Sequence, residues 1–366
     1  MGGALATGPT RTVQAIAAGS DHSCAIVNGS AYCWGFDGTG QLGNNSTADS
    51  LVPISVDGLT SGVTAIAGCY GHTCAVVGGG AYCWGYGYYG QLGNNSTAPS
   101  HVPVPVNGLT ASVTAIATGY THSCAIVSGS AYCWGDGYYG ELGNNSTTGS
   151  LVPVSVDGLT SGVTAINAGS QHSCAIVNGS AYCWGVNLHG QLGNNSPTTG
   201  GSLVPVPVTG LTSGVTAIAG TGYHNCAIVS GGAYCWGQNN YGQLGNNSTT
   251  GSLVPVPVTG LTSGVTAIAG SEDHSCAIAS GGAYCWGYNF YGQLGNSSTT
   301  DSLVPVPVTG LTSGVSAIAS GYAFSCAIVD GSAYCWGQNS ISGRNYSQLG
   351  NNSTARSLVP VRVLTP

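Results

Sequence analysis

The sequence predicts an all-β protein, a seven-bladed β-propeller with four antiparallel strands in each blade. A Cys-x8-Cys pair recurs seven times, at intervals of 50 residues with a single interval of 52. Each pair brackets a two-residue turn between short apolar runs, and a proline-containing apolar run follows it. A period near 50 that is built from short β segments is typical of a propeller with one blade per repeat.

The first predicted strand of each repeat is a run such as Val63 to Ala67, which reads V-T-A-I-A. It contains the small residues that are needed where strands crowd near the axis of a propeller. We therefore expect this strand to be the innermost of its blade.

The second and third predicted strands form a β-hairpin, which in the first repeat spans His22 to Gly35. Asn28-Gly29 supplies the two left-handed residues of a type I′ turn. Counting outward from this turn places the two cysteines opposite each other at a non-hydrogen-bonded position, where Cα atoms lie about 4.5 Å apart. That distance suits a disulfide. The same count predicts one hairpin disulfide per blade: Cys24–Cys33, Cys74–Cys83, Cys124–Cys133, Cys174–Cys183, Cys226–Cys235, Cys276–Cys285 and Cys326–Cys335.

A metal site is the alternative interpretation of these pairs, because a histidine precedes the first cysteine by two residues, as in His22-x-Cys24. Two thiolates and one histidine leave the shell of a zinc ion incomplete, so the disulfide is favoured. Cys69 has no partner in this pattern. We expect a free thiol there, with an intermolecular disulfide as the alternative.

The fourth predicted strand is a run such as Val102 to Val106, which reads V-P-V-P-V. Residues two apart direct their N–H groups to the same side of a strand, so Pro103 and Pro105 remove donors from one side only. Proline is tolerated in a sheet on such an edge. This strand is therefore predicted to be the outermost, where its prolines also oppose edge-to-edge aggregation.

The domain prediction follows from the order of these strands, which runs from about Val13 to Val363. Residues 1–12 form an N-terminal extension and residues 13–366 a single propeller. Because the chain starts with an inner strand and ends with an edge strand, we expect the seventh blade to close the ring by packing against the first.

The composition restricts the partners and the compartment. The chain has 366 residues, 4% charged residues, a net charge of −7, four arginines and no lysine. We expect no nucleic-acid partner and no binding to an anionic membrane, because no basic patch can form. No apolar run approaches the roughly 20 residues of a membrane span, so no membrane insertion is expected.

The paired cysteines favour an oxidising compartment, extracellular or at the cell surface. Met1 to Thr10 lacks the basic start and apolar stretch of a signal peptide. We therefore expect that the sequence is a mature or recombinant form without its leader.

The repeat A-G-x-x-H-S-C-A-I-V-x-G-x-A-Y-C-W-G, followed by G-Q-L-G, resembles the repeat of the regulator of chromosome condensation family. The resemblance extends over essentially the whole chain and implies a seven-bladed propeller, but little about function. Eukaryotic members act as nucleotide-exchange factors for a small GTPase or bind chromatin. This chain departs from them in its paired cysteines, its lack of lysine and its Asn/Ser/Thr-rich loops. It looks more like secreted bacterial members, some of which bind protein partners.

One histidine recurs in each of six repeats, at His22, His72, His122, His172, His224 and His274, and Phe324 replaces it in the seventh. Metal binding or acid–base chemistry is one interpretation. The phenylalanine and the scarcity of nearby carboxylates favour a structural role, and the one tryptophan per repeat is expected to wedge between neighbouring sheets. No catalytic motif, metal site or phosphate-binding loop stands out, so we expect no catalytic residue, no cofactor and no enzymatic activity.

Two sets of loops vary between the repeats, whereas the connector G-L-T-S-G is nearly constant. They join the first strand to the second and the third to the fourth, and in an up-and-down blade both emerge on one face. This face is rich in Tyr, Phe, Asn and Gly, which supply contact area at low entropic cost. Drift on exposed loops is the alternative explanation of the variation.

We therefore predict a secreted or cell-surface, non-enzymatic binding module that recognises a protein or a glycan. The alternative is a self-assembling structural subunit of an extracellular layer or filament. The predicted contact residues are Tyr86, Tyr88, Tyr89, Tyr138, Tyr139, Tyr241, Tyr288, Phe290, Tyr291 and Tyr346.

Overall fold

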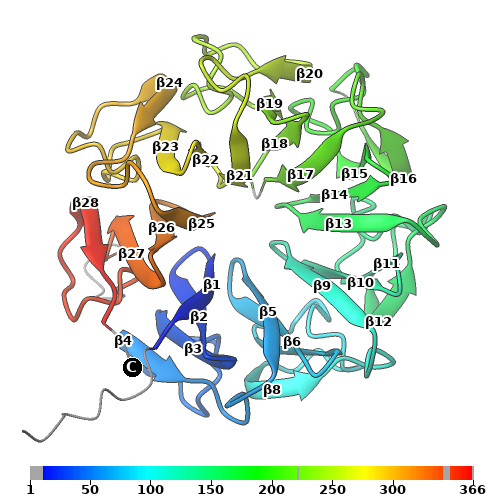
Figure 1. Ribbon diagram of the computed structural model, residues 1–366. Helices are drawn as coiled ribbons and strands as arrows, with labels where there is room; N and C mark the ends of the chain where they lie inside the picture. Colours follow the sequence, from blue (N-terminus) through cyan, green and yellow to red (C-terminus); the bar gives the residue numbers. More distant parts are fainter. Residues whose placement is uncertain (1–10, 199, 221, 341–346, 365–366) are drawn as a thin grey trace, which may run out of the picture.

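The computed structural model describes residues 11–198, 200–220, 222–340 and 347–364. Seven four-stranded antiparallel sheets are arranged in a ring, which confirms the predicted propeller (Figure 1). In every sheet the strands are hydrogen-bonded in chain order, and we number the blades 1 to 7 along the chain. Most of the predicted N-terminal extension, residues 1–10, lies outside the described residues.

The strands take four positions in each blade, from the axis outward. The innermost are β1 (Val13–Ala18), β5 (Val63–Gly68), β9 (Val113–Thr118), β13 (Val163–Ala168), β17 (Val215–Ala219), β21 (Val265–Gly270) and β25 (Val315–Ser320). The second are β2 (His22–Val27), β6 (His72–Val77), β10 (His122–Val127), β14 (His172–Val177), β18 (His224–Val229), β22 (His274–Ala279) and β26 (Phe324–Val329). The third are β3 (Ser30–Gly35), β7 (Gly80–Gly85), β11 (Ser130–Gly135), β15 (Ser180–Val186), β19 (Gly232–Gly237), β23 (Gly282–Gly287) and β27 (Ser332–Gly337). The outermost are β4 (Ser50–Ser55), β8 (Ser100–Pro105), β12 (Ser150–Ser155), β16 (Gly201–Pro207), β20 (Ser252–Pro257), β24 (Ser302–Pro307) and β28 (Ser357–Arg362).

The central hairpin of each blade has the register that the turn predicts. In blade 1, Asn28 and Gly29 have φ angles of 50° and 78°, as a type I′ turn requires. Cys24 lies opposite Cys33 and forms a disulfide with it, with a Cα–Cα distance of 4.1 Å. The other six blades contain the equivalent disulfide, so the predicted pairing is confirmed.

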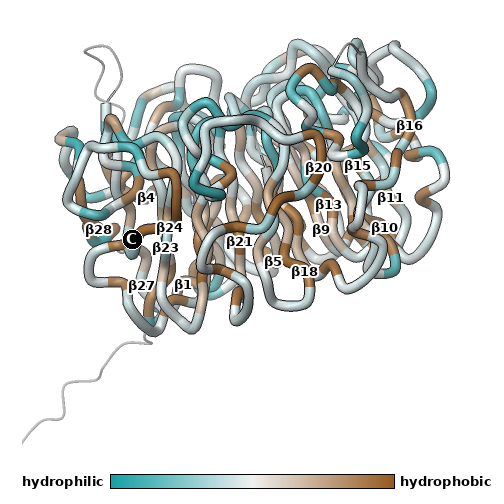
Figure 2. The backbone as a smooth tube through the Cα atoms, turned by 90° about the horizontal axis from the view of Figure 1, so that it is seen from above, coloured by the Kyte–Doolittle hydropathy of each residue, from teal (hydrophilic) through white to brown (hydrophobic). Residues whose placement is uncertain are grey.

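The hydrophobic core lies between blades rather than within them. Each of its clusters combines side chains of two neighbouring blades, with one fully buried tryptophan in the contact. Trp84 of blade 2, for example, packs with Cys24, Ile26 and Leu42 of blade 1, and its Nε1–H donates to the Gln41 carbonyl at 2.8 Å. The tryptophans therefore wedge between the sheets. Figure 2 shows the hydrophobic positions mainly along the strands.

The ring closes by packing of blade 7 against blade 1, without exchange of a strand among the described residues. Trp34 of blade 1 donates to the Gln348 carbonyl at 2.8 Å, as the other tryptophans do across their interfaces. Val13 N–H donates to the Gly331 carbonyl at 2.9 Å. The described part of the chain contains no helix that is long and apolar enough to cross a membrane.

Candidate functional site

The two variable sets of loops meet on one face of the ring, which we call the loop face. In blade 1 the Phe36 N–H, directly after β3, donates to the Asp21 carbonyl of the loop before β2 at 2.9 Å. Gly35 allows this contact, because a Cβ atom there would lie 2.6 Å from the Asp21 carbonyl oxygen. The equivalent hydrogen bond occurs in the other blades, for example from Tyr86 to Gly71 and from Tyr288 to Asp273.

The loop face holds most of the exposed large apolar side chains of the described residues. Eleven such side chains are exposed, and nine of them lie in its loops. The two others, Leu151 and Leu364, lie on an edge strand and after the last strand. The nine are Tyr70, Tyr88, Tyr89, Tyr138, Tyr139, Leu188, Tyr241, Phe290 and Tyr322.

The predicted contact residues form three groups of rings. Tyr86, Tyr88 and Tyr89 lie together in blade 2, with the centroids of the first two 5.0 Å apart. Tyr138 and Tyr139 form an edge-to-face pair at 4.8 Å. The third group joins two blades, because Tyr241 lies 4.7 Å from Tyr288, which also contacts Phe290 and Tyr291. Tyr346 lies outside the described residues.

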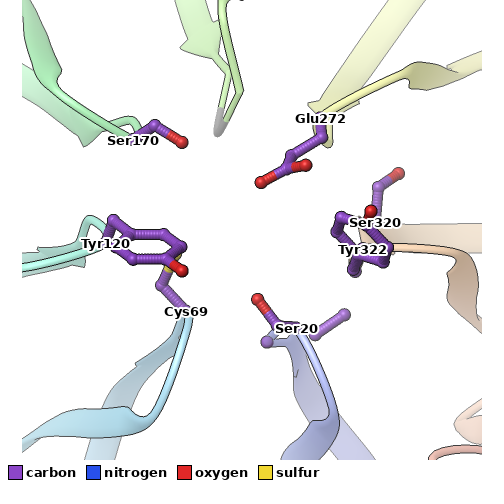
Figure 3. A pocket seen from close by; sticks show the side chains of 10 residues that line it. Ser20, Cys69, Tyr120, Ser170, Glu272, Ser320 and Tyr322 are labelled. Atoms are coloured by element: carbon purple, nitrogen blue, oxygen red, sulfur yellow. The ribbon is translucent and has the colours of Figure 1, made fainter. Parts of the chain in front are cut away.

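The centre of the loop face contains a pocket that none of the predicted contact residues lines. It encloses about 160 Å³ and is lined by Ser20, Asp21, Tyr70, Tyr120, Glu272 and Tyr322; we call it the central pocket. Figure 3 shows the adjoining part of the axial opening, which shares four lining residues with this pocket, with Tyr120 and Tyr322 on opposite sides and the Glu272 carboxylate directed into it. The sequence feature that indicates this pocket is the variation of the loops after the inner strands, because these loops lie nearest to the axis.

Burial controls the charges at this pocket. It raises the pKa of Asp21 to about 6, and burial together with the neighbouring Asp273 raises the pKa of Glu272 to about 7. Desolvation disfavours the carboxylate form, and no Lys or Arg lines the pocket to offset it. Cys69, the free cysteine, is buried beside the pocket, and burial raises the pKa of its thiol to about 12.

The recurring histidines begin the second strands and are fully buried between the blades, directly beneath the loop face. His72 Nε2 lies 2.9 Å from Ser123 Oγ of the next blade, and the other five make the equivalent contact with a Thr, Ser or Asn. Burial lowers their pKa values to between about 3 and about 4. No group of three metal-ligating side chains occurs among the described residues.

Comparisons with known proteins agree with this architecture. A family described as the RCC1-like domain matches residues 113–365, and the regulator of chromosome condensation (RCC1) repeat matches residues 28–76 and 78–126. No curated protein matches the chain by sequence.

Several solved structures share the fold. Human WBSCR16 has a TM-score of 0.78 and 23% identity, and the match covers 92% of this chain and 94% of that one. Yeast RCC1 (Prp20) bound to Kap60 has a TM-score of 0.76 and 20% identity, with 97% and 84% of the two chains covered. Prp20p of Saccharomyces cerevisiae, described with its binding properties to Gsp1p and histones, has a TM-score of 0.77 and 20% identity over 97% and 88%.

These neighbours correct the expected localisation and function. The expected extracellular or cell-surface localisation is contradicted by these neighbours, among them Prp20p with its described binding to Gsp1p and histones. The likeness to secreted bacterial members is not supported. The secreted binding module and the alternative extracellular structural subunit are overturned by the same neighbours. Glycan binding and self-association also lack support, whereas protein partners agree with the neighbours. The prediction of an oxidising compartment rested on the paired cysteines, which are only indirect evidence of where a protein is located.

The expectation that the chain is not an enzyme is also contradicted. Yeast RCC1 is similar over 97% of this chain, and eukaryotic members of the family act as nucleotide-exchange factors.

Proposed function

The chain belongs to the RCC1-like domain family, and on that premise we propose that it binds a protein partner through the loop face. The observation that carries the proposal is the concentration of exposed apolar rings, since nine of the eleven exposed large apolar side chains lie there. Aromatic side chains are enriched in the cores of protein interfaces, where they lose little conformational entropy on binding.

The charges of the loop face favour a basic partner. Asp49, Asp136, Asp273 and Asp301 lie in its loops together with Asp21 and Glu272. Arg356 is the only Lys or Arg among the described residues of these loops. A negative surface steers basic proteins toward it and disfavours nucleic acid. Histones, which the description of yeast Prp20p names as partners, have this chemistry.

The test is a titration of the full chain with core histones at physiological salt, in which calorimetry measures the heat of binding. We expect the double variant Tyr88→Ala/Tyr89→Ala to weaken binding about tenfold or more. Tyrosines that become buried when an interface forms are frequent hot spots. Both side chains are exposed, at 61% and 47%, so the fold should tolerate their removal.

Leu364→Ala is the matched control, since Leu364 is 46% exposed but lies off the loop face. An equal loss of affinity in this control would place the binding surface elsewhere. Histone binding that both variants leave unchanged would count against the tyrosine surface in the same way.

Nucleotide exchange on a small GTPase is a second candidate function. It is supported by the similarity to yeast Prp20p, whose description names Gsp1p, and by the family membership. The test is the release of a fluorescent GDP analogue from Gsp1p in the presence of the chain. Faster release that the Tyr88→Ala/Tyr89→Ala variant abolishes would support exchange through the loop face. Release at the uncatalysed rate would reject this candidate.

A further inference from the structure

We infer that the central pocket binds an ammonium group, such as that of a lysine or methylated lysine side chain or of a small quaternary ammonium compound. The inference rests on the proposed function only in so far as a protein partner would supply the lysine. The pocket itself is open to a free ammonium ligand.

The walls of the pocket are aromatic. Tyr70 and Tyr120 stack with ring centroids 4.0 Å apart. Tyr322 lies on the opposite side of the opening from Tyr120 (Figure 3). Tyr70 and Tyr322 are 41% and 44% exposed, so part of their surface is free for a ligand. A cation near the face of an aromatic ring is attracted by the ring quadrupole, and aromatic cages of this kind bind methylated ammonium groups.

Two acidic side chains, Glu272 and Asp21, complete the lining of the pocket. Glu272 directs its oxygens into the pocket, and no hydrogen bond or ion pair engages them among the described residues. Burial raises the pKa of Glu272 to about 7, because the carboxylate lacks a compensating positive charge there. A bound cation would supply that charge.

Other ligand classes fit less well. The volume of about 160 Å³ is roughly ten times what one water molecule needs, so the pocket can hold an organic group. A calcium ion prefers six to eight oxygen ligands, several of them carboxylate oxygens, whereas no group of three metal-ligating side chains occurs among the described residues and three of the six lining residues present aromatic rings. The carboxylates repel anions, and the surrounding acids Asp21 and Asp273 add to that repulsion.

The test compares choline with its neutral isostere 3,3-dimethylbutan-1-ol, titrated into the full chain by calorimetry at pH 8. At pH 8 Glu272 is mainly ionised, because this pH lies above its pKa, which burial raises to about 7. We expect saturable binding of choline and affinity lower by about tenfold or more for the isostere. Equal binding of the two compounds would overturn the inference, because only the charge differs.

Variants of the pocket give the second measurement. We expect Glu272→Gln, which keeps the shape and removes the charge, to weaken choline binding about tenfold. Tyr322→Ala removes an exposed ring, which the fold should tolerate, and should have a similar effect. Asp157→Asn is the control, since Asp157 is an exposed acid in a turn outside the loop face. Unchanged choline binding by Glu272→Gln, or an equal loss in Asp157→Asn, would refute the site.

A final pair of titrations identifies the source of the ammonium group. A short peptide with trimethyllysine is compared with the same peptide carrying norleucine, which lacks the charge. Stronger binding of the trimethyllysine peptide supports a protein source, and binding of choline alone supports a small-molecule source of the same group. Choline binding does not require the protein partner, so a failed histone titration would leave this inference standing.

Discussion

At the residue scale, the buried histidines link neighbouring blades as neutral donors. Thr73 Oγ1 donates its hydrogen to the Gln41 carbonyl at 2.9 Å, so the hydroxyl oxygen is free to accept from His22 Nε2 at 2.8 Å. Nε2 therefore carries a proton, and Nδ1 is buried without a hydrogen-bond partner among the described residues, which favours a neutral ring. Protonation of a ring without access to water is unfavourable, which lowers the pKa of His22 to about 4.

The pH dependence of stability follows from this burial. A histidine whose folded pKa lies below the unfolded value of about 6.5 stabilises the fold fully above that value, and the contribution is lost as pH falls toward the folded pKa. Burial raises the pKa of Asp37 and Glu141 to about 7. The contribution of these carboxyl groups to stability depends on pH in the opposite direction. It is fully present below about pH 4 and is lost as pH rises through 7.

His122→Phe tests the role of one histidine. Phe324 occupies the equivalent position in blade 7 over Gly321, and His122 lies over the equivalent Gly119, so the ring should fit. We expect a loss of about 1 kcal/mol in unfolding free energy at pH 7, from one lost hydrogen bond. At pH 5 the parent loses about 2 kcal/mol at this site, since the folded pKa of His122 is about 3.

The variant should therefore be at least as stable as the parent at pH 5, as measured by urea unfolding followed by tryptophan fluorescence. The reverse exchange, Phe324→His, is the matched control and should make the protein more sensitive to acid. The same loss for His122→Phe at both pH values would contradict the neutral, buried state of this histidine.

At the scale of the element, the hairpin was predictable because its determinants are local. The turn Asn28-Gly29 fixes the register, and the register alone places Cys24 opposite Cys33. The edge strand was predictable for the same reason. Val106 N–H donates to the Ala81 carbonyl, toward the neighbouring strand. The adjacent residue Pro105 therefore has its nitrogen on the other side of the strand, where no further strand pairs with it.

The central pocket depends on contacts that no local pattern encodes. Tyr70 and Tyr120 belong to neighbouring blades and are 50 residues apart in the sequence. Their stacking depends on the angle between the blades, as does the direction of Glu272 into the opening. The sequence shows that these loops vary, but the side chains that converge are defined only by the closed ring.

The cysteines provide a test at this scale. The fourteen disulfide cysteines are at most 1% exposed, so a reductant must first open the hairpin. We expect iodoacetamide to label no cysteine rapidly in the native protein, even with dithiothreitol present. After denaturation it should label one cysteine, Cys69, without reductant and all 15 with reductant.

Mass spectrometry counts these labels directly. Fifteen labels on the denatured protein without reductant would mean that the hairpins contain thiols and would contradict the cross-links. Burial should also slow the reduction of these disulfides, because the rate of thiol–disulfide exchange depends on the access of the attacking thiol.

At the scale of the whole molecule, stability is shared between blades. Every blade contributes one side of a core cluster to each neighbour, so a single blade has no complete core of its own. Repeat proteins with such interfaces gain stability from nearest-neighbour contacts. A ring adds one further contact, the seam between blades 7 and 1, where residues more than 300 positions apart in the sequence pack together.

The seam can be tested with two chemically matched variants. Trp34 donates to the Gln348 carbonyl at 2.8 Å across the seam, and Trp184 donates to the Glu141 carbonyl at 2.7 Å between blades 3 and 4. Each carbonyl also accepts from a serine, Ser23 or Ser173, so phenylalanine removes one of two hydrogen bonds in both cases. The local cost should therefore be similar at the two sites, about 1 kcal/mol for the hydrogen bond plus a term for the cavity that the smaller ring leaves, since both tryptophans are fully buried.

The consequences should nevertheless differ, because a short connector keeps blades 3 and 4 together, whereas only non-covalent contacts hold the seam. Reforming a contact across a long loop costs more entropy than across a short one. We expect Trp34→Phe to accelerate amide hydrogen exchange in β1 and β28 more than Trp184→Phe accelerates it in β12 and β13. Equal acceleration at the two interfaces would mean that the ring opens as readily between covalently linked blades as at its seam, and that closure has no weak point.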